Sequence, residues 1–308
     1  MTVARILVTG GAGFIGSHTV DRLLQQGKEV VVLDNLFSGK LTNLNLQHPQ
    51  LEFIEGDVLE YPLLVDLLKD CNAVLHLAAI ASVPYSIEHP IYSYQVNVQG
   101  FLHVLEAIRQ SKRSIRLVYA SSAAVYGEAK TLPCSDEVPL DSIPLSPYAL
   151  QKIENERIAA LYQHQYQVRS LALRYFNVYG PRQDPRSTYS GVISRFLDDY
   201  QKQQGLTIFG DGQQSRDFIH VHDVANANEL ALNHHQAGMI NIATGRAETL
   251  LSLVSCIEKA GGHPAPCTFA SPREGDIKTS YATTDKAMRE LSFNYTISLQ
   301  EGVKLLLG

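Results

Sequence analysis

The sequence predicts an α/β fold: a doubly wound parallel sheet with helices on both faces, followed by a smaller C-terminal α/β domain. Short apolar runs alternate with segments of helical periodicity through the first half of the chain. A glycine-rich turn joins the first apolar run to the first of these helical segments. After residues 180–182 the pattern loosens into shorter elements interrupted by proline and glycine.

The elements follow in chain order from these patterns. Residues 5–9 form an apolar run, and after the glycine turn Ile15, Val20, Leu23 and Leu24 recur at helical spacing. Later apolar runs and periodic segments repeat this alternation. The predicted strands are 5–9, 29–33, 51–55, 73–77, 115–120 and 168–174, and the predicted helices are 13–26, 60–70, 89–111 and 148–165.

We expect two domains, 1–175 and 176–308, partly interleaved, because the chain is expected to cross back to the sheet near 216–245. The 308 residues, of which 45% are hydrophobic and 19% charged, are ordinary for a soluble globular protein. A net charge of −5 argues against nucleic-acid binding, and no apolar run reaches membrane-spanning length. The short segment before the first strand is no signal peptide, so a cytoplasmic location is expected.

The glycine turn has the context of a dinucleotide-binding site. Gly10, Gly13 and Gly16 lie between the first strand and the first helix, where the missing Cβ atoms let a pyrophosphate approach the helix N-terminus. The second strand ends in Asp34, whose carboxylate would bind both ribose hydroxyls of NAD and repel the 2′-phosphate of NADP. The sequence therefore predicts an NAD-binding Rossmann fold.

Tyr148 and Lys152 are four residues apart in a predicted helix, so they share one face. A tyrosine needs its pKa lowered by about three units, or roughly 4 kcal/mol, to act as a base at neutral pH. A lysine ammonium and an oxidised nicotinamide ring are two positive charges able to supply this. Ser122 could then hold the substrate oxygen that loses its proton.

With these motifs the chain resembles the extended short-chain dehydrogenase/reductase family, and within it the UDP-sugar 4-epimerases. The resemblance runs nearly end to end. It rests on TGGAGFIGSH at 9–18, DNL at 34–36, GDV at 56–58, HLAA at 76–79, YASSAAVYG at 119–127, SPYALQK at 146–152, RYFNVYGPRQ at 174–183, GDGQQSRDFIHVHDVA at 210–225 and PREGD at 272–276.

The resemblance implies NAD as cofactor, a UDP-sugar as substrate, and Ser122, Tyr148 and Lys152 as catalytic residues. The implied cofactor contacts are Gly10, Gly13, Phe14, Ile15, Gly16, Asp34, Asn35, Asp57, Val58, Leu77, Ala78, Ala79, Asn97, Tyr148 and Lys152. Two of these have plain alternatives, since Asp57 could cap the helix that follows and Asn97 could be a buried polar group of a helix.

The implied substrate contacts include arginines, because guanidinium groups bind diphosphates through directional, charge-assisted bonds. They are Ser122, Tyr148, Asn177, Ile208, Phe209, Arg216, Arg273, Asp276 and Ser280. Asn177, Arg216 and Arg273 match the diphosphate site. Ile208 and Phe209 match the uracil site, and Asp276 matches a carboxylate that contacts the ribose or orients an arginine. The alternative is that Arg216–Asp217 and Arg273–Asp276 are local ion pairs on the surface.

In this family, the residue four positions after the PREGD aspartate controls access of the C2 substituent. Here it is Ser280, whose small side chain favours UDP-GlcNAc and UDP-GalNAc, with UDP-glucose and UDP-galactose as further candidates. A shift of one residue would place Tyr281 there and reverse this conclusion. His220 and His222, which precede Asp223, are expected to share one face of a strand, and we predict no metal site there because Asp/His groups of this kind are more often structural.

The predicted activity is reversible C4 epimerisation through a 4-keto intermediate. A UDP-glucuronate 4-epimerase remains open, whereas 4,6-dehydratases and decarboxylases are disfavoured, because Ala123 and Ala124 replace their proton-transferring residues. A non-catalytic NAD-binding regulator would not need Ser122, Tyr148 and Lys152. The resemblance also implies a homodimer formed through the helices predicted at 89–111 and 148–165.

Overall fold

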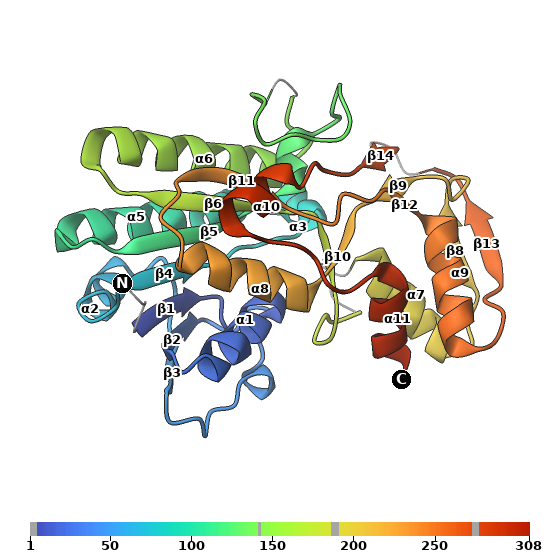
Figure 1. Cartoon of the computed structure of the whole chain (residues 1–308), viewed down its shortest axis with the longest axis horizontal. Coiled ribbons are helices and arrows are strands. Elements are labelled where there is room, and N and C mark those ends of the chain that lie inside the picture. Colours follow the sequence, from blue (N-terminus) through green and yellow to red (C-terminus); the bar gives the residue numbers. More distant parts are fainter. Residues whose placement is uncertain (1–4, 141–142, 186–190, 273–276) are drawn as a thin grey trace.

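The computed structural model describes residues 5–140, 143–185, 191–272 and 277–308. At its centre lies a large sheet whose neighbouring strands all pair in parallel (Figure 1). Its seven strands are β1 (Arg5–Thr9), β2 (Glu29–Asp34), β3 (Leu51–Glu55), β4 (Ala73–His76), β5 (Arg116–Ser122), β6 (Ser170–Tyr175) and β11 (Gly238–Ile242). The order β11-β6-β5-β4-β1-β2-β3 confirms the predicted doubly wound α/β fold.

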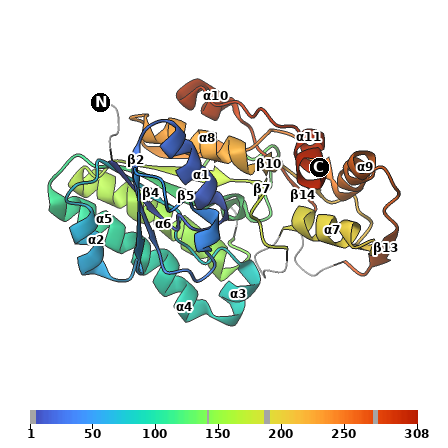
Figure 2. The same cartoon turned by 90° about the horizontal axis from the view of Figure 1, so that it is seen from below.

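Helices cover both faces of the sheet because successive side chains of a strand point to opposite faces. Ile6 and Val8 of β1 pack in one core and Leu7 in another. Figure 2 shows the two helical layers with the sheet between them. One layer holds α1 (Phe14–Gln25), α8 (Val221–Leu232) and α10 (Asp285–Leu291); the other holds α2 (Tyr61–Leu67), α5 (Gly100–Ser111) and α6 (Pro147–Tyr166).

The helix predicted at 89–111 is interrupted. α4 (Pro90–Tyr94) leads into a π-helical turn, Gln95–Gln99, before α5 begins at Gly100, and α3 (Val83–Glu88) precedes them. The extra residue of a π turn frees backbone groups from the usual ladder. Here the Asn97 carbonyl accepts a bond from Asn155 Nδ2 of α6 at 2.8 Å, so the turn is tied to the neighbouring helix.

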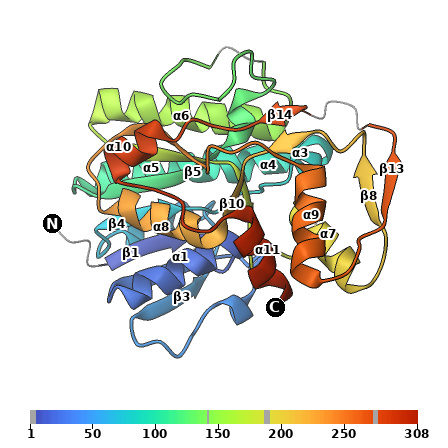
Figure 3. The ribbon, with the colours of Figure 1, turned by 45° about the vertical axis from the view of Figure 1, so that its right-hand side comes forward.

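A smaller body lies beside the carboxyl ends of the sheet strands (Figure 3). Its core is formed by α7 (Val192–Gln201), α9 (Leu250–Gly261), α11 (Leu299–Leu307) and β8 (Leu206–Phe209), and β8 pairs with β13 (Cys267–Ala270). The short strands that connect it to the large sheet are β7 (Asn177–Tyr179), β9 (Ser215–Arg216), β10 (Phe218–His220), β12 (Glu248–Thr249) and β14 (Thr279–Ser280).

The chain returns to the large sheet after β10. α8 packs against α1, and β11 adds to the edge of β6. The division of the chain at residues 175 and 176 stays a prediction. Within the described ranges, none of the helices combines the length and the apolar character needed to cross a membrane.

Candidate active site

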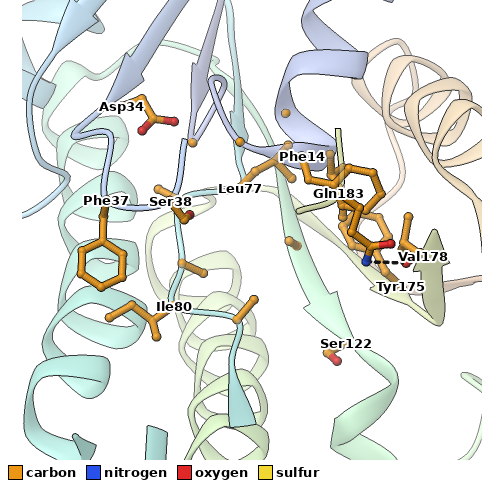
Figure 4. Close-up of a pocket in the computed structure, with 18 of the residues that line it drawn as sticks. Phe14, Asp34, Phe37, Ser38, Leu77, Ile80, Ser122, Tyr175, Val178 and Gln183 are labelled. Atoms are coloured by element: carbon orange, nitrogen blue, oxygen red, sulfur yellow. Dashed lines mark hydrogen bonds between the residues drawn. The ribbon is translucent and has the colours of Figure 1, made fainter. Parts of the chain in front are cut away.

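A cavity of about 440 Å³ opens at the carboxyl ends of the central strands (Figure 4). Figure 4 shows Asp34 and Ser122 at opposite ends of it. The predicted site residues that line it are Gly10, Gly13, Phe14, Ile15, Gly16, Asp34, Asn35, Asp57, Val58, Leu77, Ala78, Ala79, Ser122, Tyr148, Lys152 and Asn177.

The glycine turn packs so closely against neighbouring backbone that it leaves no room for side chains at Gly10 and Gly16. Gly10 has φ +71°, and a Cβ atom there would lie 2.7 Å from the Ala78 nitrogen. A Cβ atom on Gly16 would lie 2.1 Å from the Gly10 carbonyl oxygen. Gly13 precedes α1 without a side-chain cap, so first-turn N–H groups of the helix are available to an anion. These features fit a dinucleotide pyrophosphate.

Asp34 is a buried carboxylate at the end of β2. Its Oδ2 accepts from the Ala12 nitrogen at 3.0 Å and its Oδ1 from the Leu36 nitrogen at 2.8 Å. Burial raises the pKa of Asp34, and the two backbone hydrogen bonds oppose that rise. Each carboxylate oxygen keeps a further lone pair, so Asp34 can still accept bonds from ribose hydroxyls.

Asp57 lies at the cavity wall, where its contact with NAD stays a prediction, and it does not cap the following helix, because the N-cap of α2 is Glu60. The Asp57 Oδ1 accepts from the Leu59 nitrogen at 2.8 Å in the turn before α2. Its Oδ2 accepts from Asn35 Nδ2, also at 2.8 Å, and both residues line the cavity. The carboxylate therefore stabilises the local turn and orients a neighbouring amide at the cavity wall.

Asn97 lies behind the cavity wall. It is 1% exposed, and its Oδ1 accepts from the Ile80 nitrogen at 2.7 Å while its Nδ2 donates to the Ile80 carbonyl and to Gln151 Oε1. Ile80 itself lines the cavity. Both Nδ2 hydrogens of Asn97 are therefore used within the protein, and Asn97 supports the cavity wall through Ile80. Its direct contact with the cofactor stays a prediction.

Tyr148, Lys152 and Ser122 converge at the other end of the cavity. α6 presents the first two one turn apart, and the Lys152 Nζ lies 5.7 Å from the Tyr148 ring centroid. Ser122 comes from the end of β5, and its Oγ accepts from the Ala124 nitrogen at 3.1 Å. The three side chains are brought together as the sequence predicts, and their catalytic roles remain a proposal.

The pKa of Tyr148 in the protein alone differs from the lowered value that a base at neutral pH needs. Burial raises the pKa of Tyr148, and the hydrogen bond with Ser122 lowers it. Burial lowers the pKa of Lys152 to about 8, although the Glu156 carboxylate one turn away raises it. Lys152 Nζ donates to the Ala120 carbonyl at 2.9 Å. The protein alone therefore does not give Tyr148 a lowered pKa, because desolvation outweighs its polar contact.

The residues predicted on the substrate side are more dispersed. Asn177 lines the cavity, whereas Ile208 is fully buried in the core of the smaller body. Phe209 lines a second hollow beside β13. Arg216 and Ser280 lie opposite each other in the parallel pair of β9 and β14. Arg273 and Asp276 lie outside the described residues.

The alternative of a surface ion pair between Arg216 and Asp217 is wrong for Asp217, which is 0% exposed. The prediction that His220 and His222 share one face of a strand is also wrong. α8 begins at Val221, because His220 Nδ1 caps it by accepting from the His222 nitrogen at 3.3 Å. Among the described residues, no group of three or more His, Cys, Asp or Glu is placed to hold a metal ion.

Several cavity residues were missed by sequence reasoning. They include Phe37, Ser38 and Lys40 after β2, Tyr92 of α4, and Gln183, whose Nε2 donates to the Val178 carbonyl at 3.4 Å (Figure 4). The position of Ser38 and Lys40 just after Asp34 was the available signal, because loops at the carboxyl ends of strands form such sites.

Known proteins resemble this chain over nearly its whole length. The model of the NAD dependent epimerase/dehydratase family matches residues 6–243. A Methanocaldococcus jannaschii protein, provisionally named UDP-glucose 4-epimerase, is 42% identical over 301 residues, which are 97% of this chain and 96% of that protein.

Two solved structures share the fold. A Thermotoga maritima UDP-glucose 4-epimerase with UDP-glucose superposes with a TM-score of 0.92 at 36% identity, covering 98% of this chain and 97% of that one. A Methanobrevibacter ruminantium UDP-N-acetylglucosamine 4-epimerase in complex with UDP-N-acetylmuramic acid gives 0.93 at 37% identity, covering 100% and 99%.

Proposed function

The chain belongs to the NAD-dependent epimerase/dehydratase family, and from this premise we propose that it catalyses reversible C4 epimerisation of a UDP-hexose. The observation that carries the proposal is the convergence of Tyr148, Lys152 and Ser122 at one end of the NAD cavity. A phenol, an ammonium and a hydroxyl at one point suit removal and return of a proton at a sugar hydroxyl.

Each side chain has a role that follows from its contacts. Tyr148 takes the proton of the C4 hydroxyl, and Lys152 stabilises the resulting phenolate. Ser122, which hydrogen-bonds Tyr148, holds the same sugar oxygen. The chemistry that NAD supplies when bound is reversible acceptance of a hydride from the sugar carbon. The 4-keto sugar rotates while its UDP group stays bound, so either face of C4 can receive the hydride.

The burial of Lys152 and Tyr148 bears on how the proposed base is activated. Burial alone opposes both charged forms, raising the pKa of the phenol and lowering that of the ammonium. A phenolate and an ammonium formed together offset each other's desolvation. The pair therefore works as a unit, with Glu156 favouring the charged lysine.

Ala123 and Ala124 follow Ser122 at the cavity end of β5. Methyl groups cannot donate or accept protons, so they provide no acid–base pair for eliminating water. This supports epimerisation over dehydration or decarboxylation. A UDP-glucuronate 4-epimerase is the second candidate, since it needs no such pair.

The test is C4 exchange by the purified protein with NAD, on UDP-glucose and on UDP-GlcNAc. Tyr148→Phe should keep NAD bound and the fold intact, while turnover falls by about 10²–10⁴-fold or more. Failure of the wild type to equilibrate any of these sugars with its C4 epimer would refute the proposal. Near wild-type turnover of Tyr148→Phe would refute the assigned base.

For the substrate, we infer N-acetylated hexoses, UDP-GlcNAc and UDP-GalNAc. Ser280 is half-buried and lies opposite Arg216 in the β9–β14 pair, which supports a position close to a bound diphosphate sugar. Ser280→Tyr should abolish turnover of UDP-GlcNAc and spare UDP-glucose, because one bulky side chain excludes the larger C2 substituent.

Thr279→Tyr is the matched control for the substrate inference, since neighbouring strand residues point to opposite faces. Equal losses on both sugars, or none on either, would show that Ser280 does not control access. UDP-glucuronate belongs in the same assay, because turnover of that sugar alone would favour the second candidate.

We also propose a homodimer. α4, α5 and α6 expose apolar side chains, among them Ile91 at 77% and Leu161 at 54% exposed, with Leu102 and Leu150 on the same helices. Exposed apolar side chains on neighbouring helices can form a subunit contact. Light scattering should give twice the chain mass, and Leu161→Glu should shift it towards the monomer; a monomeric wild type would refute this.

A further inference from the structure

Asp217 is a buried carboxyl group that accepts hydrogen bonds from two segments of the chain. It is 0% exposed. Its Oδ1 accepts from the Thr244 nitrogen at 2.8 Å and from Thr244 Oγ1 at 2.7 Å. Its Oδ2 accepts from the Gly245 nitrogen at 2.9 Å and from the Ala282 nitrogen at 3.4 Å. One side chain thus joins the loop after β11 to the segment after β14.

The same residue lies next to every predicted substrate contact of the short strands. It directly follows Arg216, and Ala282 is two residues after Ser280. Its backbone carbonyl accepts from the Asn177 nitrogen at 3.0 Å, where β7 meets β10. Arg216 and Ser280 are paired across β9 and β14, and the Asp217 carboxylate bonds the backbone two residues beyond Ser280.

The segment bonded to Asp217 at Ala282 also contacts residues near the catalytic end of the cavity. Ala282 packs in a buried cluster with Val125 and Ile153, next to the segments that carry Ser122 and Lys152. The Ala282 segment is also bridged to Cys134, whose nitrogen donates to the Tyr281 carbonyl at 2.8 Å. The segment after β14 thus contacts both the Asp217 carboxylate and the core next to Ser122 and Lys152.

We propose that Asp217 is a positioning residue for substrate recognition. Its carboxylate ties the segment after β14 to the loop after β11, its backbone carbonyl holds Asn177, and together these contacts keep Asn177, Arg216 and Ser280 in one arrangement around the UDP-sugar. This inference rests on the proposed function, because it takes these three residues as the groups that meet the substrate. Asp217 itself need not touch the substrate, and the cofactor end of the cavity is independent of it.

Asp223 provides a matched control from the same chain. It is 2% exposed, and its carboxylate accepts from the Thr296 nitrogen, Thr296 Oγ1 and the Ile297 nitrogen at 2.9, 2.7 and 3.1 Å. The pattern of a threonine followed by a backbone N–H repeats that of Asp217. Asp223, however, anchors the segment before α11, and within the described part of the chain its carboxylate makes no hydrogen bond to the short strands.

The experiment compares Asp217→Asn with Asp223→Asn. An amide turns one accepting oxygen into a donor that faces backbone N–H groups, so both variants should lose thermal stability. Asp217→Asn should weaken UDP binding to the NAD-loaded protein by about tenfold or more, equivalent to about 1.4 kcal/mol, and raise KM more than it lowers kcat. It should also change the preference between UDP-GlcNAc and UDP-glucose. NAD affinity should stay near that of the wild type.

Thr244→Val and Thr296→Val are milder versions in case the asparagine variants do not fold. Each removes one hydroxyl donor and keeps the carboxylate. Thr244→Val should weaken UDP binding severalfold and Thr296→Val should not. Unchanged UDP affinity in the position 217 and 244 variants, or an equal loss in the controls, would overturn the inference. A wild type that neither binds UDP nor exchanges C4 would instead overturn the proposed function.

Discussion

Replacing Gly16 with alanine (Gly16→Ala) tests how tightly the glycine cradle is built. The added Cβ atom would lie 2.1 Å from the Gly10 carbonyl oxygen and 2.8 Å from the Gly11 Cα. To reach the 3.4 Å at which ordinary contact begins, the Gly10 oxygen must withdraw by about 1.3 Å. Gly10 cannot withdraw freely, since its nitrogen donates to the Leu33 carbonyl at 2.9 Å and its Cα faces the Ala78 backbone.

Two effects of the substitution oppose each other. In a helix such as α1, alanine raises the free energy of unfolding by about 1 kcal/mol relative to glycine. Overpacking of this kind lowers it by about 1–3 kcal/mol or more. We therefore expect a lower free energy of unfolding in urea. NAD should bind about 10–100-fold more weakly, because displacing one charge-assisted contact to the pyrophosphate costs about 1.5–3 kcal/mol.

Isothermal titration with NAD measures the affinity, and a graded control comes from Gly13→Ala. A Cβ atom on Gly13 would meet the Gly10 oxygen at 3.2 Å, so this variant should be destabilised less than Gly16→Ala. If Gly16→Ala were as stable as the wild type and bound NAD with an affinity within about threefold of the wild-type value, the Gly10 backbone could move to accommodate the Cβ atom, and our argument would be refuted.

Three further predictions concern the other end of the cavity, the ribose site and the histidines. Ser122→Ala should cost less turnover than Tyr148→Phe in the same C4-exchange assay, because water can partly replace a hydroxyl; an equal or larger loss would contradict the roles given. The wild type should bind NAD more tightly than NADP in fluorescence titrations, and Asp34→Ser should narrow the difference; tighter NADP binding by the wild type would contradict the reading of Asp34. Burial lowers the pKa values of His18 and His220 to about 4 from the usual 6.5. Between these values the unfolded chain binds more protons, so stability falls as the pH falls, by up to about 1.4 kcal/mol per pH unit for each histidine. Urea unfolding of His18→Gln should show a flatter pH dependence, and an unchanged slope would refute the argument.

Six of the seven strands of the large sheet were predictable because each contains a short apolar run, whereas β11 was not predicted. The predicted strands 5–9 and 51–55 match β1 and β3, and 29–33 differs from β2 by one residue. The two-residue strands β9, β12 and β14 were not predicted either. Such short segments have no periodicity of their own, and their conformation is set by pairing with distant parts of the chain.

In the candidate site too, the features set by local sequence could be predicted and those set by distant contacts could not. The glycines, Asp34 and the Tyr148–Lys152 spacing are local patterns, and the structure places all of them on one cavity. Burial is not local, so neither the raised pKa of Tyr148 nor the full burial of Asp217 could be foreseen. From the sequence alone, Asp217 could form a surface ion pair with Arg216. Its partners at residues 244, 245 and 282 are distant in sequence and are known only from the structure.

The position of β11 at the outer edge of β6 has a consequence for synthesis. All six residues of β6 are buried, and one side of the strand pairs with residues 238–242. While the ribosome has made only the first 200 residues, that edge is unpaired and α8 is missing from its face, so apolar surface and open backbone groups are exposed. The nascent sheet can be completed only after residue 242 has emerged, and during that interval chaperone binding or strand pairing between chains competes with folding.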